Sequence, residues 1–305
     1  MHGVIDIGSN TMRLSIYKVE KDDIQPMLSK KVMAGLAGYV NESGYMTTRG
    51  IDKTIEHLNQ FKTILRNIDV KDTYVFATAS LRNIKNSKEA TQLIEARTGF
   101  IISVLTGQEE ATLDFIGASL KNDMKDGLLI DIGGGSTELV HYLNGKILHT
   151  ISLPIGSLNL HNKYVDDFLP TKDEIRKIEK KVLKELAKME DFPLQTDVKM
   201  ICGIGGTVRG TCKLKNALFE LPSYNRTILT DDMDDILDYF QNKRYDFLTH
   251  LIKVIPDRLH TILPGMIILK TIADHFESEI IFVSEFGVRE GYLYQKIKNK
   301  GSSYE

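Results

Sequence analysis

Three short segments rich in glycine and hydroxyl residues have a composition suited to phosphate binding. They are Gly8-Ser9-Asn10-Thr11, Gly133-Gly134-Gly135-Ser136 and Gly205-Gly206-Thr207. Backbone N–H groups in such loops can point at an anion where no side chain blocks the approach. Glycine also makes ordinary tight turns, so one loop of this kind is a weak signal. Three such loops, two of them at duplicated positions, favour phosphate binding.

Carboxylates lie next to two of these loops. Asp131 precedes the glycine run, Glu138 follows it, and Asp6 has the equivalent place before Gly8. Carboxylates at strand ends that face a cleft can hold Mg²⁺ directly or through its waters. A metal-binding role is favoured for Asp131 and Glu138. For Asp6, a role as a metal ligand and a role as a turn cap are about equally favoured. The expected cofactor is therefore a hard divalent cation, Mg²⁺ or alternatively Mn²⁺.

Glu110 and Arg82 could supply the remaining chemistry. Thr106 and Glu109 have capping-box spacing at the start of a predicted helix, which leaves Glu110 to face elsewhere. Beside an anionic substrate Glu110 could take a proton from water, although acidic residues are common in first helical turns. Arg82, followed by Asn86, could clamp phosphate oxygens in a bidentate manner, with a surface ion pair as the alternative.

An internal repeat indicates how these residues are positioned. Residues 4–17 read VIDIGSNTMRLSIY and residues 129–142 read LIDIGGGSTELVHY, at an offset of 125 residues. VFATASLR at 75–82 resembles ICGIGGTVR at 201–209, at nearly the same offset. Two matches in the same order indicate two copies of one α/β unit.

The predicted elements agree with such a repeat. Apolar residues within 51–68 recur at helical spacing, and Thr171 with Glu174 forms a capping box that predicts a helix start. A boundary falls in the polar stretch 120–127. Strands are expected at 4–8, 73–77, 100–105, 127–132, 198–203 and 279–284. Strands that alternate with helices predict sheets covered by helices.

Composition narrows the classes of function. The 305 residues include 39 basic and 41 acidic side chains, so the basic excess typical of nucleic-acid binding is absent. Cys202 and Cys212 have no metal-like spacing and are expected to be reduced thiols. The N-terminus does not resemble a signal peptide, and the most apolar stretches are too short to cross a bilayer. We expect a cytoplasmic protein without membrane or nucleic-acid partners.

Six segments resemble the exopolyphosphatase and guanosine pentaphosphate phosphatase family of the actin-like ATPase superfamily. They are IDIGSNTMRL at 5–14, TASLRNIKN at 78–86, TGQEEATL at 106–113, LLIDIGGGSTELV at 128–140, GIGGTVRG at 203–210 and SEFGVREGYLY at 284–294. The resemblance implies an α/β fold with two duplicated actin-like, ribonuclease H-like domains and an interdomain cleft. The expected domains are residues 1–122 and 123–305, and the C-terminal helix near 290–305 could pack back on the first.

The resemblance also implies roles for the site residues. Glu110 would be the catalytic base, and Asp131 and Glu138 would hold Mg²⁺ and position water. The phosphate-binding set would be Ser9, Asn10, Arg82, Asn86, Gly133, Gly134, Gly135, Ser136, Gly205, Gly206 and Thr207, with Arg289 as a supporting residue. The chain stops soon after the last motif, without the helical domain of longer members, and a homodimer is expected. The segment 31–46 departs from the family pattern and is more apolar than expected.

The expected activity is Mg²⁺-dependent hydrolysis of the terminal phosphate of inorganic polyphosphate. One alternative is guanosine pentaphosphate as the substrate, because both molecules are phosphoanhydrides. A second is a sugar or acyl kinase of the same fold, which the combination of Glu110 with the glycine loops disfavours. A third is a non-catalytic sensor of alarmones or nucleotides, or an actin-like filament.

Overall fold

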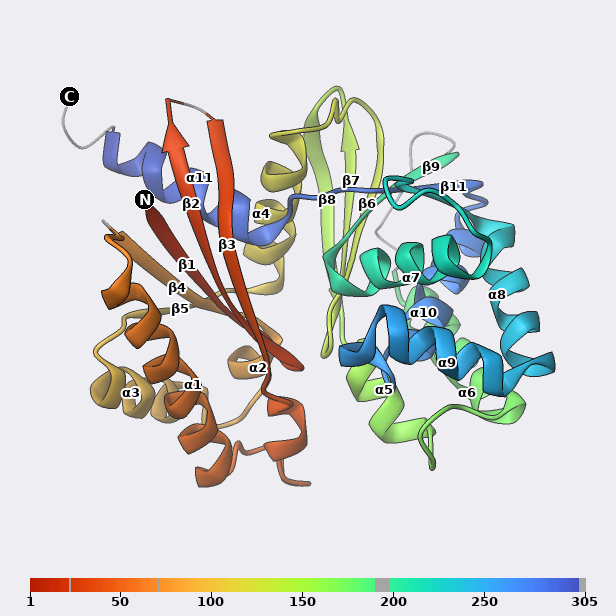
Figure 1. Cartoon of the computed structure of the whole chain (residues 1–305), viewed down its shortest axis with the longest axis horizontal. Helices are drawn as coiled ribbons and strands as arrows, with labels where there is room; N and C mark the ends of the chain where they lie inside the picture. The colour runs from red at the N-terminus through yellow and green to blue at the C-terminus, as the bar shows by residue number, and fades with distance from the viewer. Residues whose placement is uncertain (22, 71, 190–197, 302–305) are drawn as a thin grey trace. The chain divides into compact units, whose positions relative to one another are not determined.

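The chain folds into two compact units. The computed structural model describes the whole chain except residues 22, 71, 190–197 and 302–305. Unit 1 contains Met1–Gly117 and Val288–Glu305, and unit 2 contains Ala118–Gly287 (Figure 1). The division therefore falls a few residues before the boundary expected at 122. The C-terminal helix belongs to unit 1 and not to the second domain. The sequence analysis had allowed for this helix to pack back on the first domain.

Unit 1 is built on a five-stranded sheet with the order β3-β2-β1-β4-β5. The strands are β1 (His2–Ile7), β2 (Thr11–Glu20), β3 (Asp23–Met33), β4 (Asp72–Ala77) and β5 (Ile102–Val104). The first three strands form an antiparallel meander, whereas β4 and β5 run parallel to β1. The expected strands at 4–8, 73–77 and 100–105 are confirmed.

Helices cover both faces of this sheet. They are α1 (Thr48–Asn67), α2 (Ala79–Arg82), α3 (Ser87–Thr98), α4 (Gly107–Ser119), α11 (Val288–Gly301) and the 3₁₀ helix η1 (Leu36–Tyr39). Val75 and Ala77 of β4 belong to the core that α1 and α3 complete. Phe76 lies between them and contacts the ring of Tyr292 in α11, with ring centroids 4.8 Å apart. Because neighbouring strand residues point to opposite faces, α1 and α11 pack on opposite faces of the sheet.

Unit 2 repeats this arrangement with one additional strand, in the order β10-β11-β9-β6-β7-β8. The strands are β6 (Gly127–Ile132), β7 (Thr137–Leu143), β8 (Lys146–Leu153), β9 (Met200–Ile204), β10 (Thr227–Leu229) and β11 (Ile280–Val283). Again the first three form an antiparallel meander, and β9 and β11 follow in parallel to β6. The duplication expected from the sequence is therefore confirmed in strand order and direction.

Most helices of unit 2 pack against one apolar helix, α10. The set is α5 (Ser157–Tyr164), α6 (Lys172–Leu186), α7 (Gly205–Leu218), α8 (Thr230–Asn242), α9 (Arg244–Val254), α10 (Ile262–His275) and the 3₁₀ helix η2 (Pro256–Arg258). The capping box at the start of α6 is confirmed, since Thr171 and Glu174 exchange hydrogen bonds there. Helix α10 is buried along most of its length. Among the described residues, no helix is both long and apolar enough to span a membrane.

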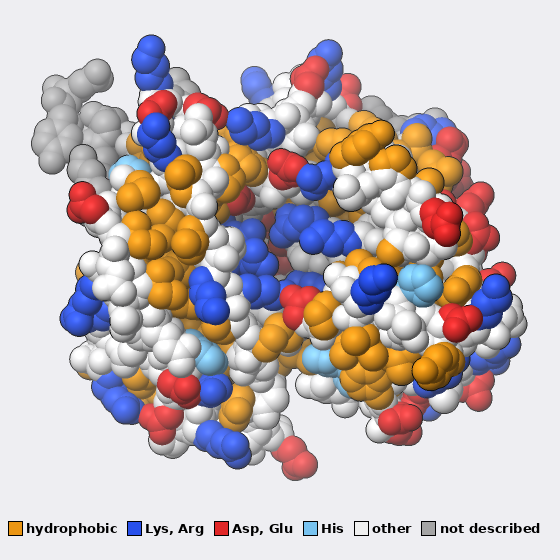
Figure 2. Space-filling model, viewed as in Figure 1, with side chains coloured by type: hydrophobic (Ala, Val, Ile, Leu, Met, Phe, Trp, Pro, Cys, Tyr) orange, Lys and Arg blue, Asp and Glu red, His pale blue; other side chains and the backbone are white. Residues whose placement is uncertain are grey.

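Strand β3 forms an exposed edge of unit 1. Apolar side chains gather over β2 and β3 (Figure 2), where Met27 is 57% exposed and Leu28 is 41% exposed. An open edge can pair with another chain, but Pro26 lacks an N–H donor, and Lys30 with Lys31 adds charge to the strand. These features oppose pairing along β3. The expected homodimer stays a prediction.

A buried hydrogen bond attaches α11 to the sheet of unit 1. The Tyr17 hydroxyl in β2 donates to Glu290 in α11 over 2.5 Å, and both side chains are buried. Burial, together with the Glu290 carboxylate, raises the pKa of Tyr17, so its hydroxyl keeps its proton. Because Glu290 is charged, removing this donor leaves a buried carboxylate with a lost partner, which costs more than removing a neutral pair.

We therefore predict that Tyr17→Phe lowers the free energy of unfolding by about 1.5–3 kcal/mol, the range for a hydrogen bond to a charged group. Urea denaturation followed by circular dichroism measures the change. Tyr45→Phe is the matched control, because the Tyr45 side chain is 45% exposed. Equal effects of the two substitutions would contradict the assignment.

Candidate functional site

The turn after the first strand of each unit is the same structure built twice. In unit 1 the Gly8 N–H donates to the Thr11 carbonyl over 3.0 Å, and in unit 2 the Gly133 N–H donates to the Ser136 carbonyl over 2.9 Å. Each turn joins a pair of antiparallel strands, β1 to β2 and β6 to β7. Their positions differ by the repeat offset found in the sequence. The two candidate phosphate loops therefore have equivalent backbones.

Backbone carbonyls of both turns accept hydrogen bonds from N–H groups of neighbouring segments. In unit 2 the Ser157 N–H at the start of α5 donates to Gly133 over 2.9 Å, and the next two amides donate to Gly134. In unit 1 the N–H groups of Ala34 and Gly35 donate to Asn10, over 3.1 and 2.9 Å. Fixing these carbonyls prevents them from turning toward a bound anion, which they would repel.

Asn10 supports a ligand role for the first turn. Its side chain is 7% exposed, as is that of Ser9. Within the described part of the chain, the Asn10 Nδ2 atom is buried and has no hydrogen-bond partner. Buried donors are nearly always satisfied, so an unsatisfied one indicates a group that the protein binds. A phosphate oxygen is an acceptor of the required kind.

The third loop packs directly against Asp131. Gly205 has a φ of +79°, and a side chain there would place its Cβ 1.9 Å from an Asp131 carboxylate oxygen. The Thr207 hydroxyl donates to the Ile132 carbonyl over 2.8 Å. Ser80 makes the corresponding bond to Ile7 in unit 1. The structure therefore brings the second and third glycine loops together with Asp131, within unit 2.

Asp131 and Glu138 form a cross-strand pair. They lie directly opposite each other on β6 and β7, so their side chains share one face of the sheet. Glu138 is fully buried, and its Oε1 accepts a hydrogen bond from Ser152 over 2.7 Å. Among the described residues no group of three or more His, Cys, Asp or Glu side chains could hold a metal. Two carboxylates fit Mg²⁺, which usually keeps several waters and takes one or two carboxylates plus substrate phosphates.

The equivalent pair in unit 1 differs. Asp6 lies opposite Arg13 on β2, not opposite a carboxylate. Arg289 of α11 also lies 3.5 Å from the Asp6 carboxylate. Burial would lower the pKa of Arg289, but the carboxylates of Glu290 and Asp6 raise it, so the guanidinium stays charged. Arg289 already offsets the charge of Asp6, and the role of Asp6 as a further metal ligand stays a prediction.

Arg258 is a site residue that sequence analysis missed. It lies in η2, and a Cβ on Gly206 would fall 1.8 Å from its Nη2 atom. Burial lowers the pKa of Arg258 to about 10, although the Asp131 carboxylate acts in the opposite direction. The guanidinium therefore lies over the third loop with its positive charge near Asp131. In the sequence, the glycine at position 206 was the signal that could have indicated this contact, because a residue without a side chain lets the guanidinium approach the loop.

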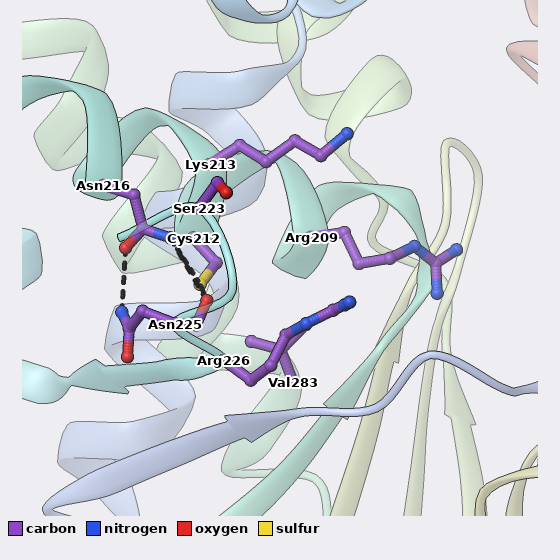
Figure 3. Close-up of a pocket in the computed structure, with 8 residues that line it drawn as sticks. All are labelled: Arg209, Cys212, Lys213, Asn216, Ser223, Asn225, Arg226 and Val283. Carbon is purple, nitrogen blue, oxygen red and sulfur yellow. Dashed lines mark hydrogen bonds between the residues drawn. The ribbon is translucent and has the colours of Figure 1, made fainter. Parts of the chain in front are cut away.

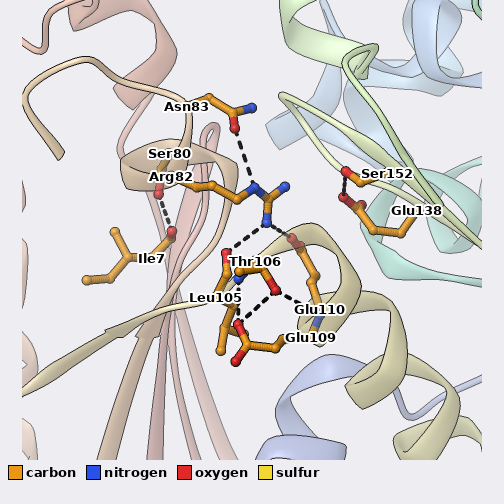
Figure 4. Close-up of polar contacts among 10 residues, drawn as sticks. All are labelled: Ile7, Ser80, Arg82, Asn83, Leu105, Thr106, Glu109, Glu110, Glu138 and Ser152. Atoms are coloured by element: carbon orange, nitrogen blue, oxygen red, sulfur yellow. Dashed lines mark hydrogen bonds and ion pairs between the residues drawn. The ribbon is translucent and has the colours of Figure 1, made fainter. Parts of the chain in front are cut away.

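Glu110 is held by Arg82 in unit 1. The Arg82 Nη1 atom donates to Glu110 Oε2 over 2.6 Å and to the Leu105 carbonyl over 3.1 Å (Figure 4). Glu110 is 6% exposed, so this ion pair is far better shielded from water than a surface pair. The surface ion pair considered for Arg82 is therefore not what the structure contains. Arg82 instead fixes the orientation of the Glu110 carboxylate.

Glu109, the neighbouring carboxylate, has a different role. Its Oε2 accepts hydrogen bonds from the N–H and the hydroxyl of Thr106, over 2.7 and 2.9 Å. The Glu109 N–H in turn donates to the Thr106 hydroxyl over 3.1 Å. The capping box expected at this helix start is confirmed. Glu109 supports the helix and leaves Glu110 to contact Arg82.

Asn86 is engaged by the backbone. Its Nδ2 donates to the Met46 carbonyl over 3.0 Å, and its Oδ1 accepts the Met46 N–H over 2.9 Å. This reciprocal pair attaches the start of α3 to the loop before α1. The second N–H of Asn86 Nδ2 is the donor left for a phosphate, and a contact of Asn86 with phosphate stays a prediction.

Sheet topology explains why these residues gather in unit 1. Strands β1, β4 and β5 are parallel neighbours, so their carboxyl ends lie at one edge of the sheet. The turn at 8–11, Arg82 and Glu110 each follow one of these three ends. Ligands of open α/β sheets bind at such an edge. The sites of unit 2 follow β6 and β9 in the same way.

The chain is similar to known proteins along nearly its whole length. The bifunctional 3-dehydroquinate synthase/phosphatase of Fusobacterium nucleatum is 30% identical over 97% of this chain, which spans 46% of that relative. Exopolyphosphatase 1 of Mycobacterium tuberculosis is 25% identical over 98% of this chain and 88% of its own length. The crystal structure of the Ppx/GppA family member of Aquifex aeolicus superposes with a TM-score of 0.78 and 26% identity, covering 98% of both chains.

The structural likeness confirms the two-domain actin-like fold expected from the sequence motifs. The sequence model of the Ppx/GppA phosphatase family matches residues 15–300, nearly the whole chain. The chain therefore belongs to the Ppx/GppA phosphatase family.

Proposed function

We propose that this protein is an exopolyphosphatase, which hydrolyses the terminal phosphate of inorganic polyphosphate. The observation that carries the proposal is the buried Glu110 carboxylate, oriented by Arg82 at the carboxyl edge of the unit 1 sheet. A hydrolase needs a base that can orient and deprotonate water, and a shielded carboxylate in a fixed orientation meets that need. A phosphatase reaction is also supported by the similarity to an exopolyphosphatase over 98% of this chain and by the match to the Ppx/GppA phosphatase family over residues 15–300.

Glu110 would accept the proton of the attacking water as the oxygen approaches the terminal phosphorus. Arg82 would hold Glu110 and an oxygen of the terminal phosphate, because a guanidinium carries five N–H donors in one plane. Positioning and charge stabilisation supply most of the catalysis in phosphoryl transfer. The shortened polyphosphate leaves with the electrons of the broken P–O bond.

The glycine loops would hold the phosphate oxygens through their N–H groups, and Asn10 would add a side-chain donor. Asp131 and Glu138 are the residues that would hold Mg²⁺, directly or through its waters. When bound, Mg²⁺ would neutralise charge on the phosphate oxygens and on the leaving chain. Arg258 would place a positive charge near Asp131.

The proposal places the protein in the cytoplasm, where thiols stay reduced. Cys202 and Cys212 are both buried and free.

Guanosine pentaphosphate is the second substrate candidate, because its terminal phosphoanhydride would meet the same groups. Measuring kcat/KM with long polyphosphate and with guanosine pentaphosphate under identical conditions separates the two. A higher value for guanosine pentaphosphate would reverse the preferred assignment.

We predict that Glu110→Gln lowers kcat for phosphate release from polyphosphate by about 10²–10⁴-fold, the usual cost of losing a general base. The amide keeps the shape of the side chain and an acceptor for Arg82, so the thermal midpoint should change little. The matched control is Glu109→Gln, because glutamine also completes a capping box. Normal turnover by Glu110→Gln, or an equal loss in both variants, would refute the assignment of the base.

We also predict that EDTA abolishes phosphate release and that added Mg²⁺ restores it. Asp131→Asn should raise the Mg²⁺ concentration for half-maximal rate by at least about tenfold, since even outer-shell changes at metal sites cost that much. A titration of the initial rate against Mg²⁺ measures the shift. Asp126→Asn, which changes an exposed carboxylate just before β6, is the control. An unshifted Mg²⁺ titration for Asp131→Asn would remove Asp131 from the metal site.

A further inference from the structure

An arginine of the C-terminal helix lies beside the carboxylate that precedes the first turn. Ile5 and Ile7 of β1 belong to the apolar core of unit 1, so Asp6 between them points to the opposite face of the sheet. Helix α11 packs on that face, and the Arg289 Nη1 atom lies 3.5 Å from Asp6 Oδ2. The hydrolysis proposed above assigns no task to Arg289.

The Asp6 carboxylate is close to the turn at 8–11. A Cβ on Gly8 would fall 3.8 Å from Asp6 Oδ1, so the carboxylate lies beside the first residue of the turn. The same turn contains Asn10, whose buried Nδ2 atom lacks a hydrogen-bond partner in the described part of the chain. A phosphate bound at this turn would therefore lie close to a negative charge, which repels it.

The contact between Arg289 and Asp6 acts mainly through charge. At 3.5 Å the two atoms are further apart than the about 2.7–2.9 Å of a charge-assisted hydrogen bond. The Arg289 Nε atom is buried and has no hydrogen-bond partner among the described residues. The side chains of Arg289 and Asp6 are only 14% and 19% exposed, so water and salt screen the pair less than they screen a surface pair.

The neighbours of Arg289 keep it charged. Burial would lower its pKa, but Glu290, Tyr17 and Asp6 act in the opposite direction and raise it. Glu290 also accepts the hydrogen bond of the Tyr17 hydroxyl over 2.5 Å. Glu290 therefore does not depend on Arg289 alone for a partner, and the guanidinium can act on Asp6.

We infer that Arg289 is a positioning residue that cancels the charge of Asp6 and so lets the turn at 8–11 accept a phosphate group of the substrate. The inference rests on the proposed function, because it concerns one of the turns assigned to the substrate. Arg289 acts through Asp6 and does not contact the substrate. A residue that only stabilised α11 would affect folding, whereas a residue that balances charge sets the affinity of the turn for anions.

The test is a cycle of four proteins: wild type, Asp6→Asn, Arg289→Met and the double variant. Inorganic pyrophosphate is titrated into each full-length protein in EDTA, with calorimetric detection, so that neither metal nor turnover contributes. Arg289→Met should weaken binding by about tenfold to a hundredfold, the effect of an uncompensated charge several ångströms from an anion. Asp6→Asn should bind more tightly than wild type, because it leaves the positive charge of Arg289 unopposed. The double variant should return to within about threefold of wild type.

The double variant decides between charge and structure. If it binds as weakly as Arg289→Met, Arg289 supports the shape of the turn and the inference is overturned. Unchanged binding by Arg289→Met also overturns it. Circular dichroism checks that each variant is folded. If Arg289→Met does not fold, Arg289→Lys should still bind within about threefold of wild type, and weaker binding by the isosteric Asp6→Asn than by wild type would refute the inference.

Two further variants control for charge elsewhere. Arg97→Met removes an arginine of unit 1 whose ion pair with Asp52 is exposed, so pyrophosphate affinity should change less than about twofold. Lys213→Gln removes one of the cations around a pocket of unit 2 (Figure 3) and should leave the order of the four affinities unchanged. An affinity that depends on Lys213 but not on Arg289 would assign the bound anion to that pocket and overturn the inference.

Binding without metal separates this inference from the proposed function. The expected order of affinities supports the role of Arg289 even if wild type releases no phosphate from polyphosphate, in which case only the proposed hydrolysis fails. Conversely, four equal affinities refute the role of Arg289 and leave the proposed hydrolysis intact.

Discussion

The hydrogen bond that closes the turn after the first strand of each unit is the constraint on which the site depends. Gly8 bonds to Thr11 and Gly133 to Ser136 in the same geometry. Each bond reverses the chain within four residues, so that an acidic residue on the first strand lies opposite a residue of the second. Carbonyls of both turns are fixed by neighbouring N–H groups, which leaves an environment suited to an anion.

The two copies of this turn have acquired different chemistry through the residues around them. In unit 1, Asp6 lies opposite Arg13 in the strand register, and the Arg289 guanidinium lies 3.5 Å from its carboxylate. In unit 2, Asp131 lies opposite Glu138, and two carboxylates share one face. Two carboxylates on one face favour a divalent cation more than a single carboxylate paired with a guanidinium does, and Arg258 adds one positive charge near Asp131. The same backbone turn is thus a candidate anion site in unit 1 and part of a candidate metal site in unit 2.

Sequence patterns predicted those features that depend on neighbouring residues. The strands around each repeat and the capping boxes at Thr106 and Thr171 follow from signals within a few positions, and the structure contains them. The contact of Arg82 with Glu110 joins residues from different elements, so no local pattern specifies it. Arg258 approaches Gly206 only through the packing of η2 on α7. Asn86 was grouped with the phosphate ligands by its motif, whereas its bonds to Met46 depend on tertiary structure.

The central claim is that water attacks the terminal phosphorus of the substrate chain. Hydrolysis of polyphosphate in water enriched in heavy oxygen, followed by mass spectrometry of the products, tests it most directly. The account predicts one heavy oxygen atom in each released orthophosphate and none in the shortened chain. Heavy oxygen in the shortened chain, or phosphate passed to an acceptor without uptake of solvent oxygen, would contradict it.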